Sequence, residues 1–332
     1  VRLAYALDRV VQPGSVFAES YGGADVTDSP LAITDALAAR GFAGKIWWSV
    51  ASLTQQAPLY ATPVLRESDE WYRALGTAEL ILNNTTFPWW FGKSQGQAYL
   101  QTCHGSPWKR IGLDQPRHTQ AANYRELLRV EPQSWDYLLA ASDDDAAAFA
   151  TAFASPARVL IGVLPRNDAL LDAGEQGRRM ARERVGVGRF GEATAYLPTW
   201  RESHLGLPTG LLRGIIRDYL STWSAQAAPT DTLLLRAHHE TSRDVLAGLA
   251  DERIIDVSRL AINDVLLAAD RLVTDYSSSL FDFALLGRPI ERFAPDQAYY
   301  EHYLRGFYDR SLAVPPKSPP LTDVVVDLIT GP

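Results

Sequence analysis

The stretch DVLLAADRLVTDYSSSLFDFALLGRP (Asp264–Pro289) contains the densest run of structural signals in the chain. Its apolar residues predict a helix over 263–269, a buried strand over Arg271–Thr274 and a second helix over Leu280–Leu286. The Gly-Arg-Pro sequence that follows contains the residue types that commonly stop a helix. A helix, a strand and a helix in direct succession are typical of an α/β protein.

The turn between this strand and the second helix is unusually rich in hydroxyl groups. It contains Asp275, Ser277, Ser278 and Ser279 directly before the helical run. Backbone N–H groups, hydroxyls and the positive end of the helix dipole would meet at this point, which favours binding of a phosphate or pyrophosphate. The alternative is an ordinary Asp or Ser cap that binds nothing.

Strand and helix signals alternate along the rest of the chain in two series. In the first series we expect strands at Ser15–Phe17, Lys45–Val50, Glu79–Leu82 and Ala98–Thr102, and helices at Leu31–Arg40, Leu65–Gly76, Tyr124–Leu128 and Ser142–Ala154. In the second we expect strands at Val159–Leu164, Ala193–Leu197, Thr232–Leu235 and Arg253–Asp256, and a helix at Gly210–Trp223. This alternation predicts two Rossmann-like doubly wound domains that face a central cleft, with ligands at the carboxyl ends of the strands.

We place the domain boundaries from the same pattern. Residues 1–156 are predicted to form an N-terminal domain, residues 157–315 a C-terminal domain, and residues 316–332 a tail. The Pro-rich segment Val314–Pro320 is predicted to cross the surface. The chain begins with Val1 rather than Met, so we expect an excised or processed segment.

Composition excludes several classes of protein. The 332 residues are 46% hydrophobic and 21% charged, an ordinary globular balance for a chain long enough for two domains. A single Cys rules out an internal disulfide framework and a Cys-based zinc site, and it fits a reducing compartment. The formal net charge of −7 argues against general affinity for nucleic acid. No apolar run reaches the roughly 18 residues needed to span a bilayer.

One region departs from this acidic balance. Six Lys or Arg residues lie between Lys93 and Val130, against Asp114 and Glu126 alone. The local excess of positive charge predicts attraction to an anionic ligand or a lipid surface, and the alternative is a solvated helix face.

His104 is the first candidate for catalysis. It follows the strand Ala98–Thr102 in the sequence Cys-His-Gly-Ser-Pro, where Gly105 and Pro107 favour a tight turn. A His at a strand end can act as a general base at neutral pH.

A second cluster follows the strand Thr232–Leu235. Arg236 and His238 can bracket a phosphate, the Arg through paired hydrogen bonds. Zinc binding by His238 and His239 is the weaker alternative, because adjacent side chains diverge on a strand and no third ligand lies at a suitable spacing.

Two further polar clusters follow strands of the second series. Arg166 and Asn167 come after Val159–Leu164, and Thr199 and Arg201 come after Ala193–Leu197. No GxGxxG, Walker A or GxSxG motif is present, so dinucleotide redox, P-loop and serine-hydrolase chemistry lose support.

Taken in order, these segments resemble the CDP-glycerol glycerophosphotransferase family, the teichoic-acid primases and polymerases of bacterial cell walls. The matching segments are FAESYGGADVTDSPLAI (Phe17–Ile33), QTCHGSPWKRIG (Gln101–Gly112), IGVLPRND (Ile161–Asp168), YLPTWR (Tyr196–Arg201), LLLRAHHE (Leu233–Glu240), the stretch from Asp256 to Ile290 and YYEHYLRGFY (Tyr299–Tyr308). The Thr-Asp-Tyr-Ser-Ser and Phe-Asp-Phe elements within Thr274–Phe283 are the most specific.

The resemblance implies a GT-B fold, in which the domain over 1–156 lies on the acceptor side and the domain over 157–315 binds the donor. It also implies an activity. It implies transfer of a polyol phosphate, glycerol phosphate first and ribitol phosphate second, from CDP-glycerol or CDP-ribitol to a hydroxyl of a lipid-linked polyanionic acceptor, with release of CMP. It implies catalysis without a metal or other cofactor. It also implies a cytoplasmic protein, peripheral on the inner face of the cell membrane, that binds no nucleic acid and can form a homo-oligomer.

The resemblance also assigns roles to the candidate residues. It implies that His104 is the base, that Arg236 and His238 act on the donor phosphates, and that Gly105 and Lys109 lie on the acceptor side. The residues assigned to binding of the CDP-polyol are Ser277, Ser278, Asp275, Asp282, Arg166, Asn167, Thr199 and Arg201.

The chain departs from the family pattern beside His104. Cys103 stands where the family usually has Trp, Ser106 stands where Thr is common, and His239 stands where Pro is frequent. The first two bear on acceptor identity more than on the type of reaction. Two other functions stay open at this point, a GT-B glycosyltransferase that uses a nucleotide sugar and a non-catalytic scaffold of the same fold.

Overall fold

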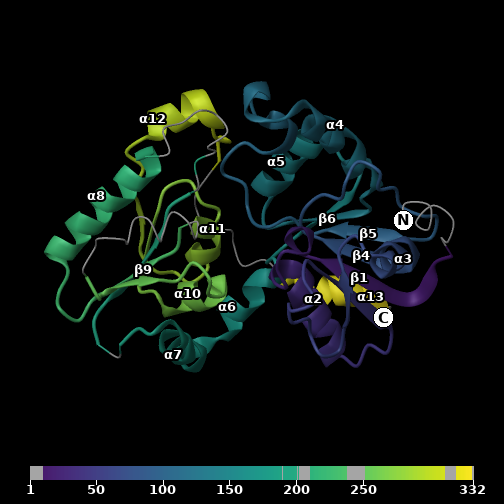
Figure 1. Cartoon of the computed structure of the whole chain (residues 1–332), viewed down its shortest axis with the longest axis horizontal. Helices are drawn as coiled ribbons and strands as arrows, with labels where there is room; N and C mark the ends of the chain where they lie inside the picture. The colour runs from purple at the N-terminus through teal and green to yellow at the C-terminus, as the bar shows by residue number, and fades with distance from the viewer. Residues whose placement is uncertain are drawn as a thin grey trace. The chain divides into compact units, whose positions relative to one another are not determined.

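The computed structural model describes residues 10–188, 190–199, 201, 210–237, 251–310 and 319–330. The chain forms two compact units, the first made of Val1–Asp168 with Pro315–Pro332 and the second of Ala169–Val314. Figure 1 shows the elements of both units in chain order by colour.

The first unit contains a seven-stranded sheet in which every pairing is parallel. The strand order is β3-β2-β1-β4-β5-β6-β7. The strands are β1 (Gln12–Glu19), β2 (Lys45–Val50), β3 (Thr62–Leu65), β4 (Ala78–Asn83), β5 (Ala98–Gln101), β6 (Tyr137–Ala140) and β7 (Arg158–Ile161). The helices are η1 (Tyr21–Gly23), α2 (Asp28–Ala39), α3 (Asp69–Thr77), η2 (Gly112–Asp114), η3 (Arg117–Thr119), α4 (Ala122–Val130), η4 (Glu131–Ser134), α5 (Asp143–Phe153), η5 (Pro165–Asn167) and α13 (Leu321–Thr330).

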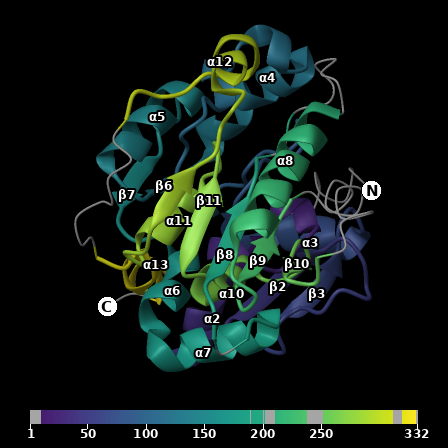
Figure 2. The same cartoon turned by 90° about the vertical axis from the view of Figure 1, so that its left-hand side faces the viewer.

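The second unit repeats this plan with five parallel strands in the order β10-β9-β8-β11-β12. Figure 2 shows β11, β8, β9 and β10 side by side, with α8 beside them. The strands are β8 (Ala193–Leu197), β9 (Thr232–Leu235), β10 (Ile254–Asp256), β11 (Arg271–Thr274) and β12 (Ile290–Arg292). The helices are α6 (Asp168–Asp172), α7 (Gly174–Val185), α8 (Gly210–Gln226), α10 (Ile262–Ala268), α11 (Ser279–Ala284), α12 (Gln297–Tyr299) and η7 (Tyr300–Leu304).

Both sheets are covered on two faces, as parallel sheets require. Along β1, Val16 and Ala18 pack into one core while Phe17 packs into the other, because successive side chains alternate across a strand. In the second unit, Ala195 and Tyr196 are neighbours on β8 and likewise pack into different cores. Short apolar runs in the sequence are therefore buried strands, as predicted.

The predicted domain limits differ from the observed units at both ends. The strand predicted over Val159–Leu164 is β7, and it pairs with β6 at the edge of the first sheet rather than opening the second domain. The segment predicted as a tail over 316–332 contains α13, which packs against α2 of the first unit (Figure 1). Hydrophobic periodicity identifies the strand but carries no information about which sheet receives it, and the helix at 321–330 was not predicted.

Helix α8 is amphipathic and packs through its apolar face. Leu212, Ile216 and Leu220 of α8 are buried in one core of the second unit together with residues of β8 and β9. The apolar face of this helix therefore packs on the sheet.

The packing of α13 gives a test with a matched control on the same helix. Val325 is fully buried and its neighbour Val324 is 41% exposed. We expect Val325→Ala to lower the free energy of unfolding of the first unit by about 2 kcal/mol, because it removes buried apolar surface and leaves a cavity. Val324→Ala should change it little.

Urea unfolding followed by Trp fluorescence measures this difference. Seven of the nine Trp residues lie in the first unit, at positions 47, 48, 71, 89, 90, 108 and 135, so the signal reports mainly on that unit. Equal losses for the two variants would contradict the docking of α13 on the first unit.

Candidate functional site

Each unit has one place where the strand order reverses. In the first unit this switch point lies between β1 and β4, and in the second it lies between β8 and β11. The helices that follow the two strands leave in opposite directions at such a point, which opens a crevice at the carboxyl ends of the strands. The candidate residues are therefore described unit by unit from these positions.

In the first unit, His104 follows β5 in a tight and strained turn. Cys103 has φ of +50° and Gly105 has φ of +121°, so the backbone around His104 lies in the left-handed region on both sides. The imidazole is exposed. Its Nδ1 lies 3.1 Å from the backbone oxygen of Asn84. A carbonyl oxygen only accepts, so Nδ1 carries the hydrogen and Nε2 carries the lone pair.

The pKa of His104 is lowered from its ordinary value. Desolvation of the imidazole by the protein atoms around it is the largest cause, although the residue as a whole is exposed, and the positive charges of Arg166 and Lys109 act in the same direction. The Asn84 carbonyl and the Asp28 carboxylate oppose the shift without cancelling it. The lowered pKa favours the neutral imidazole, the form in which Nε2 can act as a general base.

His104 belongs to a closed ring of five contacts, which we call the His104 ring. Its members are Tyr21, Asp28, Asn84, His104 and Arg166. The Tyr21 N–H donates to Asn84 Oδ1 at 2.8 Å, and the backbone oxygen of Asn84 accepts from His104 Nδ1. The backbone oxygen of His104 accepts from Arg166 Nη1 at 2.8 Å, and the same Nη1 donates to Asp28 Oδ2 at 2.9 Å. Asp28 Oδ2 accepts from the Tyr21 hydroxyl at 2.6 Å, which closes the ring.

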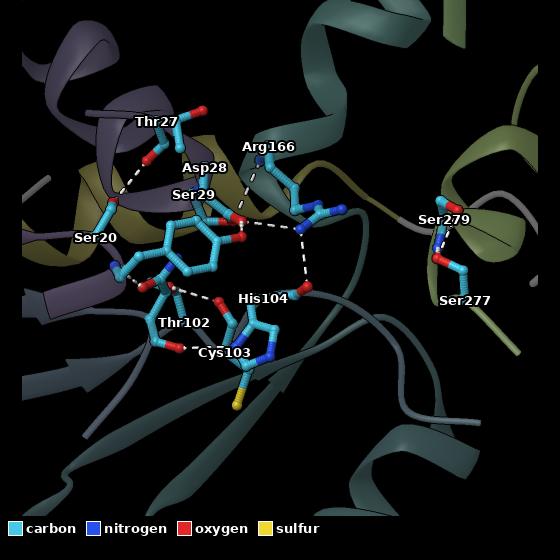
Figure 3. A network of polar contacts seen from close by, with 12 residues as sticks. Ser20, Thr27, Asp28, Ser29, Thr102, Cys103, His104, Arg166, Ser277 and Ser279 are labelled. Atoms are coloured by element: carbon cyan, nitrogen blue, oxygen red, sulfur yellow. Dashed lines mark hydrogen bonds and ion pairs between the residues drawn. The ribbon is translucent and has the colours of Figure 1, made fainter. Parts of the chain in front are cut away.

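The prediction that Arg166 and Asn167 serve the C-terminal domain is wrong about their location. Both lie in η5 of the first unit, because β7 adds to the first sheet and its following turn stays there. Figure 3 shows Arg166 reaching between Asp28 and the backbone of His104. Asn167 is buried. Direct contact of either residue with a donor stays a prediction.

The other residues of the His104 segment serve the turn or lie beside it. Gly105 provides the positive φ that other residues adopt with strain. Ser106 is buried and donates to Asp145 Oδ2 at 2.7 Å, which ties the turn to the start of α5. Lys109 is partly exposed and near enough to lower the pKa of His104 by its charge.

In the second unit, Asp275 and Thr199 face each other across the switch point. Asp275 follows β11, and its Oδ1 accepts from the Thr199 N–H at 2.8 Å. Asp275 Oδ2 lies 2.9 Å from Arg201 Nη2 in an ion pair. The three residues predicted to bind the donor are therefore brought together by the fold.

Arg201 is held on every side. Its Nε and Nη2 bond the two oxygens of Asp296 at 2.9 Å each, its Nη1 donates to the Thr199 oxygen at 2.6 Å, and Nη2 pairs with Asp275. Four of the five guanidinium N–H groups are thus used within the unit. The guanidinium also lies 4.9 Å from the ring centre of Tyr276 and 5.1 Å from that of Tyr300.

This arrangement gives Arg201 and Asp275 a supporting position. Both are almost fully buried, and although burial alone lowers the pKa of Arg201, the hydrogen bonds and charges of Asp296 and Asp275 raise it overall. The charge is neutralised inside the unit and holds the turn that follows β11. Contact of these two side chains with the donor stays a prediction.

The Ser-rich turn differs from the prediction in one respect. Helix α11 spans six residues, Ser279–Ala284, so a long helix dipole is missing behind the turn. Ser277 and Ser278 are partly exposed, and the Ser277 hydroxyl accepts from Ser279 Oγ at 2.8 Å (Figure 3). Asp282 is 2% exposed inside α11, and its contact with the donor stays a prediction.

Arg236 lies at the end of β9, as predicted. Its Nη1 donates to the backbone oxygens of Val257 and Leu260 at 2.9 and 2.6 Å, which ties it to the loop after β10. Its predicted partner His238 lies outside the described residues. Within the part of the chain that the structure describes, no group of three or more His, Cys, Asp or Glu side chains is arranged to hold a metal ion.

Four residues of these networks were missed from the sequence. Tyr21 and Asp28 lie in the segment after the first strand, Asn84 begins the polar run after β4, and Asp296 follows β12. The first three follow strands at a switch point, the same signal that identified His104. Asp296 carries no such signal, because its strand was not predicted.

The burial of Arg201 predicts a large effect when its main partner is removed. We expect Asp296→Ala to lower the stability of the second unit by about 3–5 kcal/mol, because it removes the carboxylate that pairs with two nitrogens of a buried guanidinium and leaves Asp275 as the remaining ion-pair partner. Asp323→Ala breaks an ion pair between exposed side chains and should cost far less. Thermal unfolding of the two variants measures the difference, and similar losses would contradict the supporting role of Arg201.

Comparison with known proteins identifies the relatives of the whole chain. Residues 2–319 match the model of the family described as CDP-Glycerol:Poly(glycerophosphate) glycerophosphotransferase. A teichoic acid glycerol-phosphate transferase of Staphylococcus aureus is 30% identical over 91% of this chain and 79% of its own length. A teichoic acid poly(glycerol phosphate) polymerase of Bacillus subtilis is 30% identical over 90% of this chain, which spans only 41% of that protein.

Solved structures extend the likeness to the whole fold. A variant of the wall teichoic acid polymerase TagF soaked with CDPG matches with a TM-score of 0.84 at 29% identity, over 98% of this chain and 83% of the TagF chain. A UDP-N-acetylglucosamine 2-epimerase from Listeria monocytogenes, at 12% identity and a TM-score of 0.54 over 97% of this chain and 89% of its own, shares the fold alone. The predicted GT-B class with two Rossmann-like domains is confirmed. This chain belongs to the CDP-glycerol:poly(glycerophosphate) glycerophosphotransferase family.

Proposed function

We propose that the chain transfers glycerol phosphate from CDP-glycerol to a hydroxyl of a lipid-linked or polymer acceptor and releases CMP, in the synthesis of a wall polymer of the teichoic-acid type. The observation that carries this proposal is His104, which is exposed, neutral and held by Asn84 with its Nε2 lone pair available. Membership of the family and the likeness to TagF with CDPG support the choice of donor.

The chemistry follows from these groups. The acceptor hydroxyl gives its proton to His104 Nε2, and its oxygen attacks the phosphorus that bears glycerol. The bond from that phosphorus to the CMP phosphate breaks, and CMP leaves with the electron pair. Negative charge grows on the transferred group and on the leaving phosphate, so cationic groups and aimed N–H groups lower the barrier.

The second unit provides the groups that suit the donor. Ser277 and Ser278 are partly exposed directly after the buried Asp275, at the carboxyl end of β11. Arg236 lies at the carboxyl end of β9, the strand next to β8. We assign the donor pyrophosphate to this edge, with the Ser277–Ser278 backbone and hydroxyls as its main contacts and with Arg236 and His238 beside it.

His104 is assigned to proton transfer and Ser278 to binding of the donor, so one variant of each residue tests the two assignments separately. His104→Asn should lower the rate of CMP release by about 10²–10⁴-fold and leave affinity for CDP-glycerol unchanged, because it removes only the base. Ser278→Ala should weaken binding of CDP-glycerol. Calorimetric titration with CDP-glycerol and a CMP-release assay on a synthetic acceptor measure both effects.

The outcomes distinguish the assignments. If donor binding and transfer fall together in His104→Asn, His104 is a binding residue and its assignment as the base is wrong. If donor affinity is unchanged in Ser278→Ala, the assignment of the pyrophosphate site to this turn is wrong. Running the assay with CDP-ribitol and UDP-sugars beside CDP-glycerol identifies the donor. Faster CMP release from CDP-ribitol would show that ribitol phosphate, not glycerol phosphate, is the transferred group. Transfer from a UDP-sugar would show that the reaction is glycosyl transfer.

The same proposal includes binding to an anionic membrane surface, where a lipid-linked acceptor would lie. The region between Trp89 and Val130 keeps both of these side chains and that of Tyr124 exposed, together with Arg110 and Arg117. Among the helices that the structure describes, none is long and apolar enough to cross a membrane. Surface binding through aromatic and basic side chains suits this combination.

Three of the six basic residues predicted for this surface have structural partners. Lys93 pairs with Asp136, Arg129 pairs with Glu126, and Arg125 donates to the backbone oxygens of Leu113 and Gln115. Arg110 and Arg117 are both exposed, and we choose them for the test on that ground.

Vesicle binding tests the surface. Replacement of Arg110 and Arg117 by Gln should weaken co-sedimentation with phosphatidylglycerol vesicles by roughly fivefold for each charge, because each basic residue near an anionic surface contributes about 1 kcal/mol. Arg259→Gln makes the same charge change on an exposed residue of the second unit and serves as the control. Equal binding by the unchanged protein, the variant with Arg110 and Arg117 replaced, and Arg259→Gln would contradict the proposed surface.

A further inference from the structure

Backbone strain is concentrated around His104. Five non-glycine residues in the described part of the chain have positive φ, and three of them are Tyr21 at +50°, Asp28 at +66° and Cys103 at +50°. Tyr21 and Asp28 are members of the His104 ring, and Cys103 directly precedes His104. Such conformations cost free energy and persist where the surroundings impose them, which is common at functional sites.

The ring joins segments that are far apart in the sequence. Asn84 contacts both neighbours, because its Oδ1 accepts from the Tyr21 N–H and its backbone oxygen accepts from His104 Nδ1. The Tyr21 ring lies 5.9 Å from the imidazole, centre to centre, and its hydroxyl is fixed by Asp28. Turning the imidazole would break its Nδ1 bond to Asn84, and the other links of the ring fix the backbone segments that carry His104 and Asn84.

The ion pair within the ring is largely removed from solvent. The side chain of Asp28 is 4% exposed and that of Arg166 is 11% exposed. Nη1 of Arg166 donates to both Asp28 and the His104 oxygen, so the pair is attached directly to the backbone of the base. An interaction in such surroundings is screened far less than one at the surface.

We propose that Tyr21, Asp28 and Arg166 are positioning residues for the transfer reaction, which hold His104 in the orientation and charge state of a general base. The proposal rests on the assignment of His104 as the base under the proposed function. None of the three needs to touch the acceptor. Their effect reaches the reaction through the ring orientation and the proton affinity of His104.

The two charges of the ring act on His104 in opposite directions. The groups that face the imidazole are Asp28, Arg166, Lys109, the Tyr21 ring and the Asn84 carbonyl. A negative charge at Asp28 favours the protonated imidazole, and a positive charge at Arg166 disfavours it. Removal of Asp28 should therefore lower the pKa of His104, and removal of Arg166 should raise it.

Opposite shifts give the test, through the pH dependence of kcat with CDP-glycerol. We expect the acidic limb of the profile to move to lower pH in Asp28→Asn and to higher pH in Arg166→Gln. Tyr21→Phe keeps the contact between the aromatic side chain and the imidazole and loses only the hydrogen bond from the hydroxyl to Asp28. It should lower kcat by about 10- to 100-fold through misplacement of the base, with little change in affinity for CDP-glycerol.

A matched pair on the same helix serves as the control. The Tyr60 hydroxyl donates to Asp35 Oδ1 at 2.5 Å, so it repeats the tyrosine–aspartate contact of the ring at another place on α2. Tyr60→Phe and Asp35→Asn should leave kcat and its pH profile unchanged. Thermal unfolding of all variants separates a loss of folded protein from a loss of catalysis.

Titration of the His104 imidazole by NMR, assigned by its absence in His104→Asn, gives a second readout that needs no activity. Opposite displacements of the His104 titration in Asp28→Asn and Arg166→Gln support the proposal even if CDP-glycerol is not the donor. Displacements in the same direction, no displacement, or equal kcat losses in the Tyr60 and Asp35 controls would overturn it.

Discussion

Both units depend on one type of hydrogen bond at the point where the strand order reverses. The residue directly after β4 or β11 offers a side-chain oxygen, and the second residue after β1 or β8 donates its backbone N–H to it. In the first unit Asn84 accepts from Tyr21 at 2.8 Å, and in the second Asp275 accepts from Thr199 at 2.8 Å. These N–H groups lie beyond the sheet, so the side chain takes the place of the missing strand partner.

The two bridges differ in charge. The side chain of Asn84 is neutral, and its backbone oxygen accepts from His104 Nδ1, so Asn84 fixes the tautomer without adding a full charge beside the imidazole. The carboxylate of Asp275 is buried and needs a cation, which Arg201 provides and Asp296 neutralises in turn. One unit thereby keeps an adjustable proton site, and the other keeps a rigid turn that presents Ser277 and Ser278.

Particular residues show where sequence reasoning succeeded and where it stopped. His104 was identified from its place after a strand, and the structure gives it an accepting Nε2. Arg166 was found by the same rule but assigned to the wrong unit, since pairing of β7 with β6 is a long-range choice that local pattern does not encode. Asp28 lay unnoticed inside a helix start, because its bond to Arg166 spans 138 positions of sequence.

The sequence by itself determined the element types, the two α/β series, the family and the strand-end location of most candidate residues. These follow from local periodicity, turn chemistry and motifs, which need no knowledge of long-range contacts. Only the tertiary structure decided that β7 and α13 belong to the first unit, that Arg201 is held by Asp296, and that His104 and four residues distant from it in sequence close a ring. Such facts depend on which strands pair and which side chains are desolvated together, and both are set by packing of the whole chain.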